Sequence, residues 1–422
     1  MDENTLHMKT TTIQPILLLF LLLLTLGTPR TQLNQHAFTG QSSAKRPVTI
    51  PVEITSYGGI VLQAQINNSQ PLSLWVDSGS TSPFVIGTKK ATALGLKLKD
   101  HVLGAGAAGP NTYDVFQTSG LTIRLSQVTF TNQSASVMSL GLVEEQFGRS
   151  VDGLVGLDLF LKYVVEIDYP ASRLTLYDPQ SYVYSGAGDS VPLMLCDGHF
   201  CVPARINIQD RGELVGRFVV DTGGCMMTVV LTTPFANSSN LPVPGQKTIL
   251  DRSVSGLGGA TQLLVGRAAH LKIGSTIFPS PLIYISQDQG GALASSQYEG
   301  LIGTEILRRF KVIFDYARHR LILERTAHFD EPLEYDMSGM SLRAYGLDFR
   351  TFKIYQVVQD SPAGRAGLRV GDIIEGIDAV PASRLTLEQI LQMMKAPGRE
   401  YKLTIKRDRD TSFVQLTTRR LI

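Results

Sequence analysis

The sequence predicts a mostly β protein built from two duplicated β lobes, which a smaller α+β domain follows. Three observations lead to this prediction. Alternating and β-branched apolar runs dominate the chain up to residue 325. Within that region a string of short motifs occurs twice, in the same order and at nearly the same spacing. Beyond residue 338 the pattern changes and includes one well-delimited helix.

Length and composition fit this organisation. A chain of 422 residues corresponds to about three domains, and 43% hydrophobic residues with 18% charged residues indicate packed cores. The net charge of +2 gives no reason to expect a nucleic-acid partner. The expected segments are 1–30 (signal peptide or N-terminal anchor), 31–47 (leader), 48–184 (first lobe), 185–325 (second lobe), 326–337 (linker) and 338–422 (α+β domain).

The repeated unit opens with an apolar run that ends in an aspartate, a small hydroxyl residue and a glycine. The two copies are residues 74–81 and 218–224. The apolar run is typical of a buried strand, and the glycine allows a sharp turn after it. We therefore expect Asp77 and Asp221 at tight internal turns, where a single carboxylate is costly to bury. Two such carboxylates can be buried together if they face each other and share a proton.

Each aspartate is followed at a distance by an acidic-Gly-apolar-apolar-Gly string, at residues 152–156 and 299–303. The glycine of this string lies 76 positions after the first aspartate (153 − 77) and 79 positions after the second (300 − 221). A single Asp-Ser/Thr-Gly would be explained by an ordinary turn after a strand. The matched spacing instead indicates a duplicated unit with the two aspartates at equivalent positions.

On these motifs residues 48–325 resemble the pepsin and retropepsin aspartic proteases, with short lobes like retropepsin subunits joined in one chain as in pepsin. The resemblance implies an aspartic-protease-like double β-barrel and an endopeptidase in which Asp77 and Asp221 activate a water molecule, without cofactor or metal. Ser78 and Thr222 match the hydroxyl residues that brace the two loops in that family. The residues expected to support the pair are Ser78, Gly79, Ser80, Thr222 and Gly223.

The two aspartate loops differ at one neighbouring position, which is Ser80 in the first copy and Gly224 in the second. The Ser80 hydroxyl could donate a hydrogen bond to Asp77, and Gly224 cannot do the same for Asp221. We therefore expect the shared proton to rest more often on Asp221, although the titration belongs to the pair.

Two glycine-rich segments, one in each copy, are expected to be hairpin tips that close over a substrate. Retropepsin flaps are glycine-rich, so the resemblance implies one flap per lobe; plain flexible hairpins are the alternative. The first segment formally matches GxGxxG, but no helix opens at Pro110 and no acidic residue follows about twenty positions on, which argues against a dinucleotide site. The flap candidates are Gly104, Gly106, Gly109, Gly256, Gly258 and Gly259.

Two cysteines flank a predicted hairpin turn at the start of the second lobe. In an oxidising compartment Cys196 and Cys201 could form a small disulfide. A metal site that combined them with His199 would lack a fourth ligand, so we predict no metal. We expect Cys225 to be a small buried residue.

The N-terminal 30 residues combine Lys9 with an apolar run at residues 16–24. This run is short for a membrane span and is typical of a signal peptide. We expect export to the periplasm or the medium. An uncleaved membrane anchor is the alternative, and it would be the chain's only link to a membrane.

Residues 338–422 resemble a PDZ domain, on the strings at residues 360–368 and 371–374 and on a helix that begins with a capping box at Thr386 and Gln389. The resemblance implies that a peptide adds as a strand beside the helix, with its terminal carboxylate bound by backbone N–H groups. After residue 338 there are 14 Lys/Arg against 9 Asp/Glu, which mildly favours acidic chain ends. A domain that only packs against the lobes is the alternative. The residues that match the carboxylate-binding loop are Gly346, Leu347, Asp348 and Phe349, with Asp348 in place of a usual glycine.

Two functions of different classes are therefore open. The first is an aspartic endopeptidase that acts on polypeptides through Asp77 and Asp221. The second is a non-catalytic, protease-like peptide-binding or scaffold protein of the cell envelope. The intact pair of Asp-hydroxyl-Gly loops favours the enzyme, because such a costly pair is usually kept for function.

Overall fold

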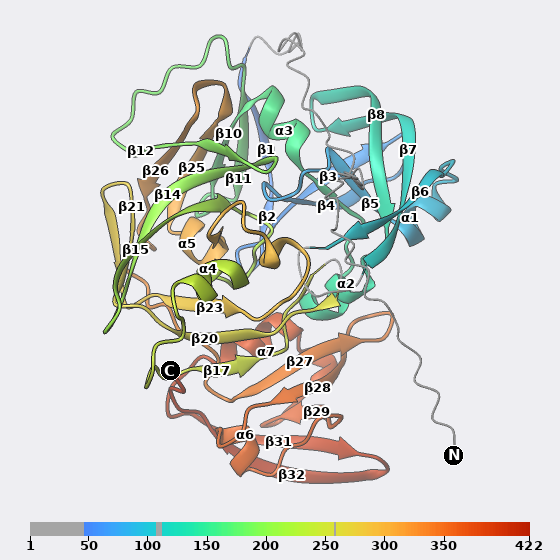
Figure 1. The fold of residues 1–422 in the computed structure, drawn as a ribbon. Coiled ribbons are helices and arrows are strands. Elements are labelled where there is room, and N and C mark those ends of the chain that lie inside the picture. Colours follow the sequence, from blue (N-terminus) through green and yellow to red (C-terminus); the bar gives the residue numbers. More distant parts are fainter. Residues whose placement is uncertain (1–45, 107–111, 257–258) are drawn as a thin grey trace, which may run out of the picture. The chain divides into compact units, whose positions relative to one another are not determined.

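The computed structural model describes residues 46–106, 112–256 and 259–422. The predicted signal or anchor segment and two flap candidates, Gly109 and Gly258, lie outside the described residues. None of the described helices is long and apolar enough to cross a membrane. The fold is mostly β, with an aspartic-protease-like β region and a PDZ-like α+β domain (Figure 1).

The first lobe is an eight-stranded sheet with the strand order β2-β3-β4-β9-β5-β8-β7-β6. Short helices connect its strands. Its strands are β2 (Glu53–Ile54), β3 (Ile60–Ile66), β4 (Leu72–Val76), β5 (Phe84–Gly87), β6 (Lys99–Ala105), β7 (Thr112–Leu125), β8 (Val128–Met138) and β9 (Gly153–Val155), and its helices are α1 (Thr88–Ala93), α2 (Gly141–Phe147) and α3 (Leu157–Lys162).

The second lobe is a ten-stranded sheet with the order β17-β20-β23-β16-β24-β15-β14-β21-β22, in which β13 pairs with β14. A separate two-stranded hairpin projects between β17 and β20. The strands are β13 (Met194–Cys196), β14 (His199–Ile208), β15 (Gly212–Val220), β16 (Val229–Leu231), β17 (Ile249–Asp251), β18 (Ser255–Gly256), β19 (Gly259–Ala260), β20 (Leu263–Arg267), β21 (His270–Ile273), β22 (Thr276–Pro279), β23 (Leu282–Ser286) and β24 (Gly300–Ile302); the helices are α4 (Thr233–Ser238), η1 (Ala292–Ala294) and α5 (Thr304–Leu307).

The duplication in the sequence is also a duplication in topology. In the first lobe the aspartate-bearing strand β4 lies parallel to β9, and in the second lobe β15 lies parallel to β24. Each of these short inner strands then pairs antiparallel with the strand that follows the aspartate loop, β5 or β16. The acidic-Gly strings of the sequence therefore supply the strands that lie beside the two aspartate-bearing strands.

A third sheet joins the two lobes. Its order is β1-β11-β10-β25-β26-β12, and the antiparallel pair of β10 and β25 connects strands of the first lobe to strands of the second. A single hydrophobic cluster extends through both lobes. The strands of this sheet are β1 (Val48–Pro51), β10 (Val164–Asp168), β11 (Arg173–Tyr177), β12 (Asp189–Pro192), β25 (Phe310–Asp315) and β26 (Arg320–Arg325). The short helix η2 (Tyr316–Arg318) connects β25 to β26.

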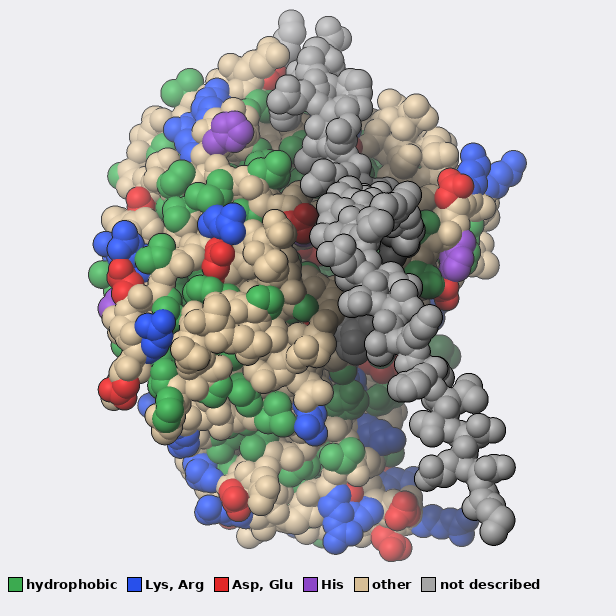
Figure 2. Space-filling view, in the orientation of Figure 1, with side chains coloured by type: hydrophobic (Ala, Val, Ile, Leu, Met, Phe, Trp, Pro, Cys, Tyr) green, Lys and Arg blue, Asp and Glu red, His purple; other side chains and the backbone are tan. Residues whose placement is uncertain are grey.

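The C-terminal domain has its own sheet, in the order β27-β28-β29-β31-β32, and its own hydrophobic core. The predicted capping box is confirmed: the Gln389 N–H donates to Thr386 Oγ1 (3.0 Å) and the Thr386 N–H donates to Gln389 Oε1 (2.8 Å). Lys and Arg side chains are scattered over this domain with acidic side chains between them (Figure 2). Its elements are β27 (Met340–Tyr345), β28 (Thr351–Val357), α6 (Pro362–Arg365), β29 (Ile373–Ile377), β30 (Val380–Pro381), η3 (Ala382–Arg384), α7 (Leu387–Met393), β31 (Glu400–Arg407) and β32 (Asp410–Thr417).

Candidate active site

The two predicted aspartates lie on matching loops, one from each lobe. Asp77 follows β4, and its N–H donates to the Val155 carbonyl of the neighbouring strand (3.0 Å). Asp221 follows β15, and its N–H donates to the Ile302 carbonyl in the same way (3.0 Å). The parallel strand beside each aspartate therefore fixes where its loop begins.

Reciprocal hydrogen bonds between hydroxyl residues tie the two loops together. The Ser78 N–H donates to Thr222 Oγ1 (2.9 Å), and the Thr222 N–H donates to Ser78 Oγ (3.0 Å). Each hydroxyl then donates to the opposite strand, Ser78 to the Val220 carbonyl (2.7 Å) and Thr222 to the Val76 carbonyl (2.9 Å). Both side chains are buried, so these four bonds hold the loops in one fixed relation.

The glycine after each hydroxyl residue allows the opposite carboxylate to come close. A Cβ atom on Gly79 would lie 2.6 Å from Asp221 Oδ1, and one on Gly223 would lie 2.6 Å from Asp77 Cγ. The same glycines bind the aspartate of their own loop, because Gly79 donates its N–H to Asp77 Oδ1 (2.9 Å) and Gly223 to Asp221 Oδ1 (2.8 Å). The structure thus brings Asp77 and Asp221 together, with a hydrogen bond between the two carboxyl groups.

Burial raises the pKa of both aspartates. The pKa of Asp77 rises to about 8, mainly because of burial and then because of the negative charge of Asp221. Burial also raises the pKa of Asp221, but the Gly223 N–H and the nearby His199 favour its ionised form. Both shifts have the same direction, so the pair binds a proton more tightly than two free aspartates would, and that proton belongs to the pair.

The hydrogen bond that the sequence predicted from Ser80 to Asp77 is not formed. The Ser80 hydroxyl donates to the Ser82 carbonyl (3.4 Å), and Asp77 interacts with the backbone N–H of Ser80. The N–H of Gly224 interacts with Asp221 in the same manner. This position therefore does not distinguish the two loops, and the predicted preference of the proton for Asp221 loses its basis.

His199, considered from the sequence only as a metal ligand, lies close enough to Asp221 to affect its pKa. It lies at the start of β14, with its ring edge-on to Tyr298 (5.8 Å between ring centroids). The ring also interacts with the backbone of Gly79, and burial lowers the pKa of His199. No signal in the sequence connects His199 with Gly79, because the two residues come from different lobes.

The described flap candidates lie on two hairpins. Gly104 is part of β6, which pairs with β7, and the Gly106 carbonyl accepts a hydrogen bond from the Ala292 N–H of the second lobe (3.1 Å). Gly256 and Gly259 face each other in the hairpin of β18 and β19. The first hairpin therefore reaches across to the other lobe.

The two cysteines of the predicted disulfide are free thiols in the structure. In the β13–β14 hairpin Cys196 is opposite His199 and Cys201 is opposite Met194, so the two cysteines are diagonal neighbours. Their side chains still interact, and burial together with this contact raises the pKa of Cys201. The expected disulfide is thus not formed, because the register does not place the cysteines opposite each other.

The four residues predicted as a carboxylate-binding loop form the turn between β27 and β28. Leu347 is fully exposed, and the Phe349 N–H donates within the turn to the Gly346 carbonyl (3.3 Å). The following strand, β28, pairs with β27 on one edge and with β29 on the other. The predicted role of Gly346, Leu347, Asp348 and Phe349 therefore does not fit the structure, because no peptide strand can be added next to β28.

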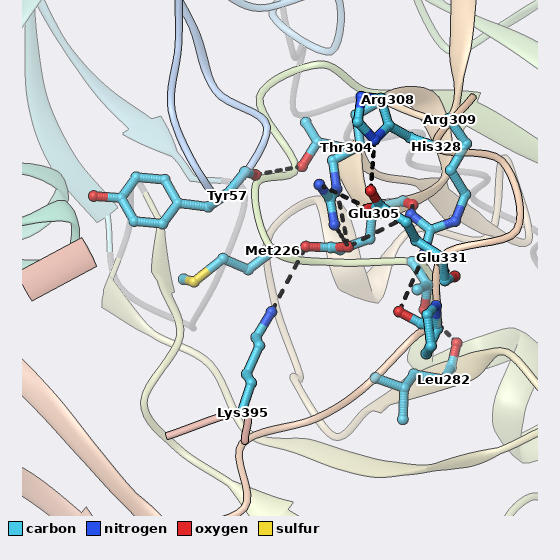
Figure 3. A network of polar contacts seen from close by, with 12 residues as sticks. Tyr57, Met226, Leu282, Thr304, Glu305, Arg308, Arg309, His328, Glu331 and Lys395 are labelled. Carbon is cyan, nitrogen blue, oxygen red and sulfur yellow. Dashed lines mark hydrogen bonds and ion pairs between the residues drawn. The ribbon is translucent and has the colours of Figure 1, made fainter. Parts of the chain in front are cut away.

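The loop of Asp221 rests on a polar network around α5 (Figure 3). The Glu305 N–H donates to the Met227 carbonyl (3.0 Å), and the Thr304 hydroxyl donates to the Tyr57 carbonyl (2.7 Å). The Glu305 carboxylate accepts hydrogen bonds from Arg308 (3.0 and 3.1 Å). The segment that follows Asp221 is therefore bonded to α5, whose Glu305 is paired with Arg308.

Comparisons with known proteins found two family matches and similar solved structures. The family model described as "Aspartyl protease" matches residues 62–159, and the one described as "PDZ domain" matches residues 353–407. Among solved structures, the chain is similar to the crystal structure of an aspartic proteinase from Irpex lacteus, with 16% sequence identity, a TM-score of 0.44, and coverage of 68% of this chain and 99% of that chain. No curated protein matches the sequence. Residues 62–159 thus match an aspartyl protease family, and residues 353–407 match the PDZ domain family.

Proposed function

We propose that the protein is an aspartic endopeptidase that hydrolyses peptide bonds with Asp77, Asp221 and one activated water molecule. The observation that supports this most is the pair of hydrogen-bonded carboxyl groups, held by the Ser78–Thr222 bonds, of which one keeps its proton near neutral pH.

Each carboxyl group has a separate part in the proposed reaction. Ionised Asp221 accepts a proton from the water molecule as that water attacks the scissile carbonyl carbon. Protonated Asp77 donates a hydrogen bond to the carbonyl oxygen, on which negative charge develops. The attacking group is water, so no covalent intermediate with the protein forms. The proton that Asp221 has accepted then passes to the amide nitrogen as the bond between this nitrogen and the carbonyl carbon breaks and the amine leaves. The two hairpins would close over the substrate and exclude other water molecules.

A digestion assay tests this proposal. An unfolded polypeptide is incubated with the purified protein, with and without pepstatin, and the products are identified by mass spectrometry. Asp77→Asn should lower the rate of cleavage by about 100- to 10,000-fold, because it removes a group that donates or accepts a proton in the reaction. The matched control is Asp330→Asn, which changes an exposed aspartate outside the site. If the wild-type protein binds the polypeptide without cleaving it, the non-catalytic binding function is favoured.

Peptide recognition by the C-terminal domain and export from the cytoplasm stay predictions. Binding of peptides with free carboxyl ends to the full chain would test the first of them. N-terminal sequencing of the protein recovered from each cellular fraction would test the second.

A further inference from the structure

We infer that the C-terminal domain binds the two lobes of its own chain and positions the hairpin of β18 and β19, called here the second flap. Arg343 is the positioning residue. This inference rests on the proposed function, because it assigns a regulator to the same site. It starts from the edge of the C-terminal sheet.

The sheet edge beside α7 is covered from within the chain. β27 is an edge strand and contacts α7, so it is the edge at which a peptide would be added beside this helix. The first-lobe helix α2 lies against this edge (Figure 1). A Cβ atom on Gly148, directly after α2, would lie 2.7 Å from Leu387 Cβ and 3.2 Å from Ala344 Cβ. The lobes thus occupy the place of a peptide ligand.

The loop that leads into β27 already binds a carboxylate of the chain itself. Asp336 Oδ1 accepts hydrogen bonds from the N–H groups of Ser338 (3.0 Å) and Gly339 (2.6 Å) and from the Ser338 hydroxyl (2.8 Å). This loop lies at the C-terminal end of α7, because the Met337 N–H donates to the Met394 carbonyl (3.0 Å). The chain therefore supplies both parts of a peptide ligand itself: α2 lies where the peptide would lie, and the Asp336 side chain takes the place of the terminal carboxylate.

Arg343 connects this edge to the base of the second flap. Its side chain is only 2% exposed and donates to the Ser253 carbonyl (2.6 Å) and to Ser255 Oγ (2.6 Å). A third hydrogen bond reaches the Leu142 carbonyl of α2 (3.3 Å), and the guanidinium lies over the ring of Tyr355, 4.5 Å from its centroid. Hydrogen bonds from a buried charged group are among the stronger ones, so this contact fixes the start of β18.

Gln356 holds the other side of the flap base. β17 is the edge strand of the second-lobe sheet. The Gln356 amide donates to the Leu250 carbonyl (2.6 Å) and accepts from the Arg252 N–H (2.7 Å), as a neighbouring strand would. Side chains of the C-terminal domain therefore bond both β17, which precedes the second flap, and β18, which is its first strand.

A separate contact reaches the loop of Asp221. Lys395, just beyond α7, lies with its Nζ 3.9 Å from Glu305 Oε1, and Figure 3 shows it pointing toward this carboxylate. Glu305 is buried and, through its N–H, supports Met227 a few residues after Asp221. The C-terminal domain thus contacts the flap and the support of one aspartate.

The test compares Arg343→Gln with Arg343→Lys, which keeps the charge, and with Arg409→Gln, a change of an exposed arginine in the same domain. Hydrogen–deuterium exchange is followed by mass spectrometry over residues 249–263, and kcat and KM are measured with one peptide. We expect Arg343→Gln to speed exchange in this segment at least about tenfold and to raise KM about tenfold with little change in kcat. Arg343→Lys should recover part of both effects, and Arg409→Gln should resemble the wild type.

A second variant guards against the case in which Arg343→Gln does not fold. Gln356→Leu keeps the side-chain volume and removes both hydrogen bonds, so exchange at residues 249–252 should also accelerate. Unchanged exchange at the flap base in the folded variants, or acceleration spread evenly over the whole chain, would overturn the inference. Because exchange needs no substrate, this result is independent of whether the protein proves to be a protease.

Discussion

At the scale of single residues, the site depends on buried polar atoms that satisfy one another across the two lobes. Ser78 and Thr222 each contribute a hydroxyl group that accepts a hydrogen bond from the opposite loop and donates one to the opposite strand. Removal of one partner leaves buried backbone groups without a hydrogen bond, which costs more than the bond itself contributes.

Ser78→Ala should therefore destabilise the protein. The substitution leaves the Thr222 N–H and the Val220 carbonyl without their partner, and the expected loss in the free energy of unfolding is about 1–3 kcal/mol. Urea denaturation measures it. Ser78→Thr keeps the hydroxyl group and should lose much less. Ser73→Ala, a control at an exposed hydrogen bond, should stay within about 0.5 kcal/mol of the wild type.

The pH dependence of activity follows from the pKa values of the pair. Activity needs one proton, so kcat/KM should fall as the pH rises through about 8, where Asp77 also ionises. It should fall again at acid pH, where Asp221 becomes protonated. A protonated His199 favours ionised Asp221 and so lowers the pKa of that group.

His199→Gln should consequently move the acidic limb of the pH profile to higher pH. The reason is that the neutral amide cannot stabilise the Asp221 carboxylate with a positive charge. The measurement is kcat/KM against pH with one peptide substrate, and His328→Gln serves as the control because that histidine is exposed and pairs with Glu331. An acidic limb at the wild-type position would contradict the assigned role of His199.

At the scale of secondary structure, the glycines of the two acidic-Gly strings allow β9 and β24 to pack closely against the backbone of a neighbouring strand. A Cβ atom on Gly153 would lie 2.2 Å from the Val85 carbonyl oxygen, and one on Gly300 would lie 2.1 Å from the Val230 carbonyl oxygen. The strands β9 and β24 can approach their antiparallel neighbours only because these positions have no side chain.

Gly153→Ala should therefore cost at least about 1–3 kcal/mol in the free energy of unfolding, because β5 and β9 must separate to admit the methyl group. The loss of cleavage should accompany the loss of stability, since β9 fixes the start of the Asp77 loop. Gly141→Ala is the control, because a Cβ atom there has only Ser139 Oγ as a neighbour, at 3.7 Å. Thermal or urea unfolding measures the free energy of unfolding of both variants, and equal stability of the two would contradict the prediction.

The strands and turns around the aspartates could be predicted from the sequence because each is determined by residues that are adjacent in the chain. An apolar run, an aspartate, a hydroxyl and a glycine define a strand and its turn, and the second copy supports the first. The capping box at Thr386 was equally local and is confirmed. The role given to residues 346–349 failed because it depended on which strand forms the sheet edge. That edge is β27 and not β28, and strand order is set by long-range pairing that a short motif does not encode.

At the scale of the whole molecule, the site is a product of two lobes in one chain. The shared sheet through β10 and β25 and the hydroxyl bonds between the loops both join the lobes, so neither lobe alone carries the pair. The sequence predicted this duplication. It could not predict the contact of His199 with Gly79, or the contacts of Arg343 and Gln356 with residues 250–255, because each joins residues that are far apart in the chain and belong to no motif.

The most direct test of the central claim is a complementation measurement on one peptide substrate. The rate kcat/KM is determined for the wild-type protein, for Asp77→Asn, for Asp221→Asn and for an equimolar mixture of the two variants. If both aspartates of one chain form the site, the wild type cleaves, each variant loses about 100- to 10,000-fold, and the mixture is no better than its components. Full activity in either variant, or activity restored in the mixture, would contradict the account.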